Sequence, residues 1–262
     1  MDPNGKVVII TGASAGIGAA TARAFADAGA RVVLAARNAA RLAEVARGLA
    51  GPALIVPTDV ADRAAVEALV ARAVAEYGGI DIVVNNAGVG LAAPVAEIAF
   101  EDFQRALAVD LFGPLALTQA ALPHMRRRGR GQLIYVSSVV GLRALPYLGG
   151  YAAAKAALDR LVESLRVELR GSGVAITLVR PGTTSTGFAQ HRLGSGHEQR
   201  RISARAATPE QVALAILRAA RREPRVVYIS WADRARVLLS LLAPGLADWM
   251  LGRAFGWEER EV

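Results

Sequence analysis

The sequence contains no cysteine and only three histidines. Without cysteine, the chain has no disulfide scaffold, no thiol nucleophile and no thiolate metal site. No two of the histidines His124, His191 and His197 have a ligand-like spacing. We therefore predict that the chain holds no catalytic metal.

Acidic residues are fewer than basic ones, and the formal net charge is +8. Local arginine clusters occur at residues 126–128 and 218–225, but no aromatic residues interleave with them. We interpret these clusters as solvated helix ends and predict no nucleic-acid partner. A basic surface still attracts anionic cofactors or acidic partners.

Neither end of the chain carries a long uninterrupted apolar run. Residues 1–6 lead directly into a strand-like segment without a basic-then-apolar leader, which predicts a cytoplasmic protein. The apolar stretch 237–251 is interrupted by Pro244, Gly245 and Asp248 and is short for a bilayer span. We predict that residues 231–262 form an apolar helical extension that packs on the domain, on a partner subunit or on a membrane surface.

Strand-length apolar runs alternate with helix-forming stretches from residue 7 to about residue 230. This alternation, without a linker or a repeat, predicts one α/β domain over residues 1–230: a doubly wound parallel sheet with helices on both faces. Strands are expected at 7–10, 31–36, 53–57, 80–84, 132–137, 174–179 and 225–229, and long helices at 100–128 and 149–170. Residues 183–207 are polar and rich in glycine, which indicates a mobile loop over the site.

Polar or glycine-rich motifs follow these strands. They are Gly12–Gly18, Asp59, Asn85–Gly88, Ser138 and Pro181–Gly182. In a parallel sheet, ligands bind outside the carboxyl ends of the strands. The shared placement of the motifs therefore predicts a single site at that edge.

Gly12, Gly16 and Gly18 lie between the first strand and the helix that follows it. Glycines at such a turn let the backbone approach a pyrophosphate, which binds at the positive end of the helix. The spacing is one residue away from the usual dinucleotide fingerprint. A tight strand–helix turn without a ligand is the alternative interpretation.

Tyr151 and Lys155 are spaced to lie one turn apart on a helix. An ammonium beside a phenol favours the phenolate and lowers the tyrosine pKa toward the range of a general acid or base. Such a pair also arises by chance on ordinary helices, and Ser138, taken alone, reads as a turn cap.

Taken together, these motifs resemble the short-chain dehydrogenase/reductase family. The sequences Thr11–Gly18, Asn85–Gly88, Ser138, Tyr151-x-x-x-Lys155 and Pro181–Gly182 match in order and spacing over about residues 5–230. Members are single-domain Rossmann-like enzymes that move a hydride between a nicotinamide and an alcohol/carbonyl pair. The resemblance implies the same fold and the same class of reaction here.

The resemblance also implies roles for individual residues. Tyr151 would donate a proton to the developing alkoxide, Lys155 would lower its pKa and hold the ribose hydroxyls, and Ser138 would bind the substrate oxygen. Asp59 and Val60 would contact the adenine, and Asp59 would also serve as a helix cap. The cofactor contacts implied are Gly12, Ser14, Ala15, Gly16, Ile17, Gly18, Arg37, Asn38, Asp59, Val60, Asn86, Ala87, Gly88, Tyr151, Lys155, Pro181, Gly182, Thr184 and Thr186.

The end of the second strand bears on the choice of cofactor. An acidic residue there would select the non-phosphorylated cofactor, but the sequence reads Ala35-Ala36-Arg37-Asn38. No carboxylate repels a 2′-phosphate, and Arg37 is able to bind one bidentately. We predict NADP(H), although Arg37 is also interpretable as a solvated arginine at the start of a helix.

One catalytic position departs from the family pattern. The long central helix of the family usually carries an asparagine that holds a water between the lysine and solvent, and this chain has Asp110 there. A carboxylate accepts hydrogen bonds from water or from Lys155, so a proton relay survives. It also offsets the lysine's charge, which predicts a higher Tyr151 pKa and an alkaline optimum for alcohol oxidation.

The leading hypothesis is an NADP(H)-dependent carbonyl reductase or alcohol dehydrogenase for a small, apolar substrate. We expect residues 141–147, 91–94 and 183–207 to form the substrate pocket. The alternative is a dinucleotide-binding regulator with weak or no turnover, for which Asp110 is the only support. A lipid-directed reductase held at a membrane by residues 231–257 is compatible with the first hypothesis. We also predict a homodimer or homotetramer paired through residues 101–128 and 149–170.

Overall fold

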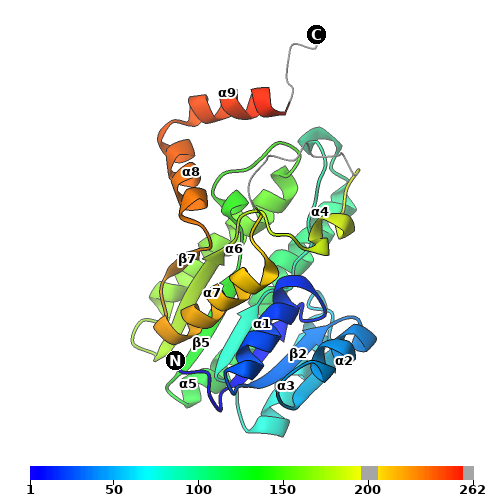
Figure 1. Cartoon of the computed structure of the whole chain (residues 1–262), viewed down its shortest axis with the longest axis vertical. Helices are drawn as coiled ribbons and strands as arrows, with labels where there is room; N and C mark the ends of the chain where they lie inside the picture. The colour runs from blue at the N-terminus through cyan, green and yellow to red at the C-terminus, as the bar shows by residue number, and fades with distance from the viewer. Residues whose placement is uncertain (196–205, 256–262) are drawn as a thin grey trace.

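The fold is that of a computed structural model, which describes residues 1–195 and 206–255. Seven parallel strands form one sheet in the order β3-β2-β1-β4-β5-β6-β7 (Figure 1). They are β1 Val7–Thr11, β2 Arg31–Ala36, β3 Ala53–Pro57, β4 Ile82–Asn85, β5 Gly131–Val136, β6 Val174–Arg180 and β7 Val226–Tyr228. The strand order reverses between β1 and β4, which is where an α/β sheet opens a ligand crevice. The predicted doubly wound parallel sheet is confirmed.

Helices cover both faces of the sheet, and alternate residues of β1 separate the two cores. Val7 and Ile9 pack in the core under α3, α5 and α6, whereas Val8 and Ile10 pack in the core under α1, α2 and α7. This period of two is what a strand buried on both faces requires. The helices are α1 Gly16–Asp27, α2 Ala39–Arg47, α3 Arg63–Tyr77, α4 Phe100–Leu107, α5 Gly113–Arg127, α6 Gly149–Glu168 and α7 Pro209–Arg222.

The long helix expected over 100–128 contains an irregular turn. A π-helical turn, Ala108–Phe112, joins α4 to α5 and places Asp110 in the interior. Such a turn adds one residue to the helical repeat and changes the direction of the side chain it carries, and it is frequent at functional sites. The turn therefore marks Asp110 as a residue of the site.

A buried ion pair holds α6 against the sheet. Arg180, the last residue of β6, donates from Nη2 and Nε to Asp159 Oδ2 of α6 at 2.8 and 3.1 Å. Its Nη1 donates to the Tyr228 hydroxyl of β7 at 3.2 Å. Because α6 also carries Tyr151 and Lys155, this pair fixes the helix on which the site is built.

The segment after β6 and the C-terminal region complete the described chain. The expected loop contains a short 3-10 helix, η4 Gly187–His191, and Leu193 pairs with Leu91 in an isolated bridge. The remainder of that loop, residues 196–205, lies outside the described residues, as do residues 256–262. Residues 231–255 form two helices, α8 Trp231–Leu242 and α9 Pro244–Ala254, which meet at a bend of 117°.

Candidate active site

Ser138, Tyr151 and Lys155 converge at the carboxyl end of β5. Ser138 follows the strand, and its Oγ accepts a hydrogen bond from Val140 N at 3.3 Å and donates to Pro181 O at 3.4 Å. Hydrogen bonding with Ser138 also lowers the pKa of Tyr151. Tyr151 and Lys155 lie one turn apart on α6, with Lys155 Nζ 5.7 Å from the centre of the tyrosine ring. Lys155 Nζ donates to Val136 O of β5 at 3.3 Å. A hydroxyl donor, a phenol and an ammonium thus lie together, as the sequence predicted.

Asp110 contacts Lys155 directly. Its Oδ1 lies 2.9 Å from Lys155 Nζ, and the two side chains are 0% and 3% exposed. Val89 N donates to the same carboxylate at 3.3 and 3.4 Å. A Cβ at Gly88 would lie 2.7 Å from Asp110 Oδ1. The absence of a side chain at Gly88 therefore provides the space that the Asp110 carboxylate occupies.

These contacts set the ionisation of the tyrosine. Burial raises the pKa of Tyr151, the Lys155 ammonium lowers it, and the Asp110 carboxylate raises it again. The pKa of Tyr151 remains above its ordinary value. Burial lowers the pKa of Lys155, but Asp110, together with Tyr151 and Asp159, more than reverses this, so the pKa of Lys155 is raised and the ammonium persists.

The glycine turn after β1 forms a close backbone cradle. Gly12 has a φ of +66°, and a Cβ at Gly18 would lie 2.2 Å from Gly12 O, so neither position accepts a side chain. Helix α1 begins at Gly16 with no side-chain cap and no acidic residue in its first turn. Its first N–H groups therefore have no side-chain acceptor and suit an anion such as a pyrophosphate. These residues fit a dinucleotide.

Thr11 ties this cradle to the end of β4. Its Oγ1 accepts from Asn86 N and Ala87 N, both at 3.0 Å, and donates to Val84 O at 3.3 Å. Asn86 Nδ2 donates to Thr11 O at 2.8 Å. We did not single out Thr11 as a site residue from the sequence, although a buried polar residue at the end of an apolar strand was a usable signal.

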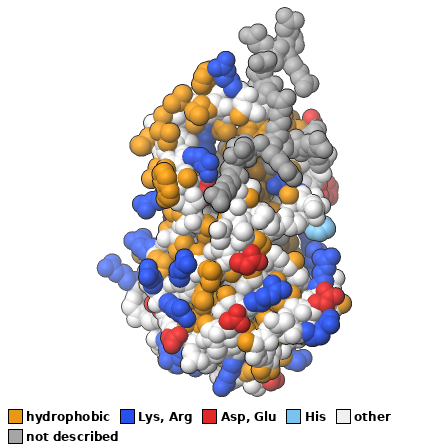
Figure 2. Space-filling model, viewed as in Figure 1, with side chains coloured by type: hydrophobic (Ala, Val, Ile, Leu, Met, Phe, Trp, Pro, Cys, Tyr) orange, Lys and Arg blue, Asp and Glu red, His pale blue; other side chains and the backbone are white. Residues whose placement is uncertain are grey.

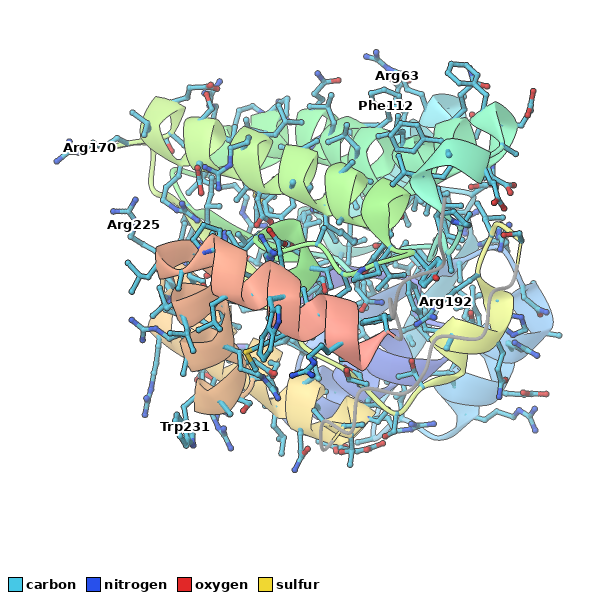
Figure 3. The ribbon with its side chains drawn as sticks, turned by 90° about the horizontal axis from the view of Figure 1, so that it is seen from above. Arg63, Phe112, Arg170, Arg192, Arg225 and Trp231 are labelled. Carbon is cyan, nitrogen blue, oxygen red and sulfur yellow. The ribbon has the colours of Figure 1, made fainter. Side chains whose placement is uncertain are left out.

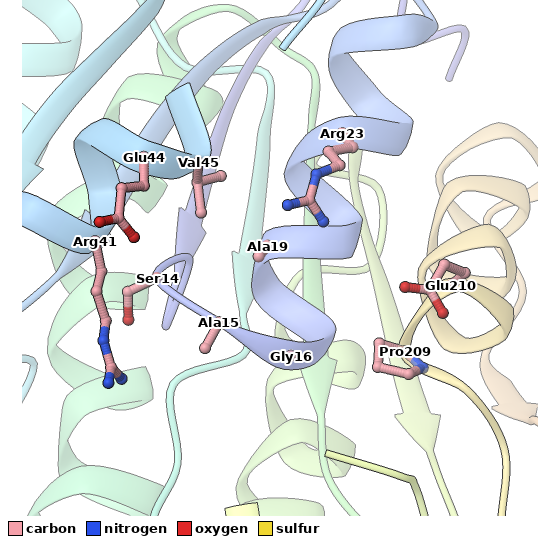
Figure 4. Close-up of a pocket in the computed structure, with 10 residues that line it drawn as sticks. All are labelled: Ser14, Ala15, Gly16, Ala19, Arg23, Arg41, Glu44, Val45, Pro209 and Glu210. Carbon is pink, nitrogen blue, oxygen red and sulfur yellow. The ribbon is translucent and has the colours of Figure 1, made fainter. Parts of the chain in front are cut away.

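A cavity of about 370 Å³ lies beside the cradle (Figure 4). It is lined by Ser14 and Gly16 of the turn, Arg23 of α1, and Arg41 and Glu44 of α2, among others. Arg41 is a cation that sequence reasoning missed, and it lies in the first turn of α2, four residues after the predicted Arg37. The cavity thus brings positive charge next to the predicted dinucleotide turn.

Two predicted cofactor residues have structural roles of their own. Asn38 caps α2 by accepting from Arg41 N at 3.0 Å. Asp59 accepts from Ala61 N at 3.0 Å and pairs with Arg105 at 2.8 Å. The expectation that Asp59 caps a helix was wrong, because Asp62 caps α3. Asp62 is three residues after Asp59 and directly precedes Arg63, the first residue of α3.

Other predicted residues meet near the cradle. A Cβ at Gly16 would lie 3.3 Å from Thr186 Cγ2, so the segment after β6 approaches the glycine turn. Pro181 O accepts from Val139 N at 3.0 Å, and Thr184 Oγ1 donates to Gly182 O at 3.3 Å. Ser14, Ala15 and Gly16 line the cavity described above, whereas Val60 is buried against Gly113.

Apolar side chains surround Tyr151 on its open side. Ala92, Val140, Leu148 and Ala152 form a small buried cluster against which Leu145 and Tyr151 pack. Phe188 of η4 adds an aromatic ring whose centre lies 5.8 Å from that of Tyr151. The sequence did not single out Phe188, because it lies in a polar segment without strand or helix periodicity. Two of the three segments expected at the pocket, 91–94 and 141–147, also meet where Ala93 N donates to Tyr147 O at 2.9 Å.

Residues 6–194 match the family model described as short chain dehydrogenase. The chain belongs to the short-chain dehydrogenase/reductase family. The predicted family is therefore confirmed, and the chain is an oxidoreductase of that family. A dehydrogenase/reductase SDR family protein 7-like from Drosophila melanogaster is 34% identical over 95% of this chain and 80% of its own length.

Solved structures of the same family are similar over most of the chain. A short-chain dehydrogenase/reductase from Burkholderia phymatum, in complex with NAD, has a TM-score of 0.85 and 27% identity and covers 94% of this chain and 96% of its own. An alcohol dehydrogenase from Thermococcus sibiricus, complexed with 5-hydroxy-NADP, has a TM-score of 0.76 and 30% identity, with 85% and 94% coverage. These relatives bind nicotinamide dinucleotides of both kinds, so the relatives alone do not decide which one this chain prefers.

Proposed function

We propose that this short-chain dehydrogenase/reductase interconverts an apolar carbonyl compound and its alcohol with NADP(H). The observation that carries the proposal is the convergence of Ser138, Tyr151 and Lys155 beside the glycine cradle. A neutral donor, a titratable phenol and a fixed cation are the groups that carbonyl reduction requires.

The residues of the chain divide the work as follows. The bound nicotinamide would supply the hydride in reduction and accept it in oxidation. Ser138 Oγ donates to the substrate oxygen and fixes its position, and the Tyr151 hydroxyl gives that oxygen its proton. The Lys155 ammonium stabilises the phenolate left behind, and Asp110 holds the ammonium in place. Gly12, Gly18 and the start of α1 hold the pyrophosphate, while Asn86 and Thr11 fix the neighbouring loop.

Preference for NADP(H) is supported by the charges after β2 and in the first turn of α2. Arg37 is exposed at the end of β2, and Arg41 lines the cavity together with Ser14. A 2′-phosphate favours paired guanidinium and hydroxyl donors of this kind. Glu44 also lines the cavity, but α2 begins with no acidic residue in its first turn.

An apolar substrate is supported by the surroundings of Tyr151. Leu145, Leu148 and Phe188 face the tyrosine with apolar surface. Such a lining favours apolar groups next to the substrate carbonyl. The Arg192 guanidinium, whose charge lowers the pKa of Tyr151, adds one cation near the tyrosine. We therefore propose ketones or aldehydes on aliphatic or ring systems.

A screen of NADPH oxidation tests the proposal. Aldehydes, cyclic ketones, 3-oxoacyl thioesters and steroids are incubated with the purified chain, and absorbance of NADPH is followed. Turnover with at least one apolar carbonyl compound is expected. NADPH binding without oxidation across the whole panel would favour the alternative of a dinucleotide-binding regulator.

We also propose that two copies pair through α4, α5 and α6. Phe100, Leu161 and Val167 are exposed apolar side chains on these helices, and Phe112 is exposed in the π-helical turn between α4 and α5. Ala152 of α6 does not belong to this face, because it is buried in the cluster beside Tyr151. Sedimentation of the chain and of the variant Phe112→Glu measures the pairing, and loss of the larger species in the variant is expected.

A further inference from the structure

Helix α9 has two different faces. Asp248 forms an ion pair with Arg143, and the Phe255 ring that follows the helix lies 6.1 Å from Tyr147. Arg143 and Tyr147 belong to the segment expected to form the substrate pocket. The inner face of α9 therefore borders the mouth of the active site.

The outer face of α9 is an apolar stripe. Leu246, Trp249, Met250 and Arg253 follow the i, i+3, i+4, i+7 spacing of one helix face, and all four are exposed. Trp249 is 57% exposed, and the Arg253 guanidinium stacks over its ring at 4.8 Å. An apolar face that ends in tryptophan and arginine is typical of helices that lie in a membrane interface.

Helix α8 extends this surface. Leu238, Leu241 and Leu242 lie on one face at the C-terminal end of the helix, and Leu242 is 84% exposed. They adjoin the α9 stripe at the bend, and Figure 2 shows apolar side chains gathered over this corner of the molecule. We call the six apolar residues Leu238, Leu241, Leu242, Leu246, Trp249 and Met250 the corner surface. So contiguous an exposed apolar patch marks an interaction site rather than ordinary surface.

The shape of the corner surface fits a bilayer surface rather than a bilayer span. Helices α8 and α9 together are long and apolar enough for a span, but the 117° bend at Ala243–Pro244 prevents them from forming one straight helix. Twelve and eleven residues are each too few to cross about 30 Å of hydrocarbon. The two helices are suited to lie in the interface.

The charge of the chain favours docking on an anionic membrane surface. Both acidic residues of the two helices are already paired, Asp233 with Arg236 and Asp248 with Arg143. Arg253 ends the α9 stripe, and the chain as a whole carries a net charge of +8. Residues 256–262 contain three glutamates and one arginine, so the positive charge that attracts an anionic surface is carried by the rest of the chain.

We propose that the corner surface docks the chain on an anionic lipid bilayer. Asp233 of α8 lies against Gly182, where a Cβ would be 2.5 Å from its Oδ2, so the docked helices also contact the loop after β6. Figure 3 places Trp231 and Phe112 on opposite sides of the molecule (Figure 3). The start of α8 therefore lies away from Phe112, which belongs to the face proposed for pairing of two copies.

Tryptophan fluorescence tests the docking directly, because the only tryptophans are Trp231, Trp249 and Trp257. In the full-length variant Trp231→Phe/Trp257→Phe, emission comes from Trp249 alone. We expect a blue shift and flotation with vesicles of phosphatidylcholine and phosphatidylglycerol, and much less with phosphatidylcholine alone. Neither readout requires turnover, so failure of docking is distinguishable from failure of the proposed enzymatic function.

Matched variants locate the contact. Leu242→Glu/Met250→Glu should abolish flotation, whereas Leu214→Glu, at an exposed leucine of α7, should leave it unchanged. Absence of flotation on either vesicle, equal binding to both, or full binding by the double variant would overturn the proposal. A dimer in sedimentation that the double variant dissociates, without vesicle binding by the parent chain, would instead assign the corner surface to a second copy.

Discussion

Asp110 Oδ1 and Lys155 Nζ are 2.9 Å apart and almost fully buried, so the lysine that we propose to act in catalysis is paired with a carboxylate of the same chain. The same carboxylate raises the pKa of the Tyr151 phenol. Alcohol oxidation needs the phenolate as base, whereas carbonyl reduction needs the protonated phenol as acid. The Asp110–Lys155 pair should therefore move the pH range of alcohol oxidation to higher pH. It should also extend the pH range of carbonyl reduction to higher pH.

Replacing Asp110 by asparagine tests this relationship. Asp110→Asn removes a negative charge near Tyr151, so the pKa of Tyr151 falls and the phenolate forms at lower pH. The pH profile of kcat for alcohol oxidation should shift toward acid, and reduction should decline from a lower pH. Asp27→Asn makes the same charge change at an exposed site on α1 and should leave both profiles in place. Coincident profiles for Asp110→Asn and the parent chain would refute the electrostatic account.

Gly88→Ala tests the space around the same pair. The added Cβ would lie 2.7 Å from Asp110 Oδ1 and 3.5 Å from Lys155 Nζ, so the carboxylate must move. We expect kcat to fall about tenfold or more, since small displacements of catalytic groups are costly. The loss should shrink in an Asp110→Ala background, where the clash is gone. Gly245→Ala, with open space around the new Cβ, serves as the control and should be neutral.

Arg37 and Arg41 should govern cofactor preference. A hydrogen bond to a charged group is worth about 1.5–3 kcal/mol, so Arg37→Ala should raise KM for NADPH about ten- to a hundredfold. Arg41→Ala should act in the same direction, and neither variant should change KM for NADH appreciably. Arg47→Ala, an exposed arginine in the last turn of α2, provides the comparison. Equal effects on both cofactors would remove the support for NADP(H).

The Arg180–Asp159 pair should contribute strongly to stability. Arg180→Met leaves a buried carboxylate without its partner and should lower the free energy of unfolding by about 3–5 kcal/mol. Arg180→Met/Asp159→Leu should recover much of that loss. Urea unfolding measures both, and Arg63→Met, which breaks an exposed pair with Glu67, should cost no more than about 1 kcal/mol. A loss as small for Arg180→Met as for Arg63→Met would show that the buried pair is unimportant.

The sequence was sufficient to predict the parallel sheet and the family, because both depend on local patterns. Buried parallel strands such as Val7–Thr11 read as apolar runs, and Tyr151 and Lys155 needed only the helical repeat to be placed on one face. The expectation that Asp110 accepts from water or from Lys155 followed from the family resemblance, and the structure shows Asp110 and Lys155 in direct contact.

Features that depend on contacts between distant segments were beyond sequence reasoning. The π-helical turn at Ala108–Phe112 has no periodicity signal, and Phe188 meets Tyr151 only through the path of the segment after β6. Arg41 lines the cavity because both α1 and α2 border it, which a pattern within one helix does not reveal. The cap of α3 is a local feature by contrast: the helix begins at Arg63, so Asp62 rather than Asp59 is the residue that caps it.

Tyr151→Phe provides the most direct test of the central claim, that Tyr151 exchanges the proton with the substrate oxygen. NADPH affinity is measured by fluorescence titration, and kcat is measured with the best substrate of the screen. We predict that kcat falls at least about a hundredfold while the Kd for NADPH changes little, because only the proton donor is removed. Retention of kcat in Tyr151→Phe would contradict the account, and so would a loss of NADPH binding large enough to explain the loss of activity.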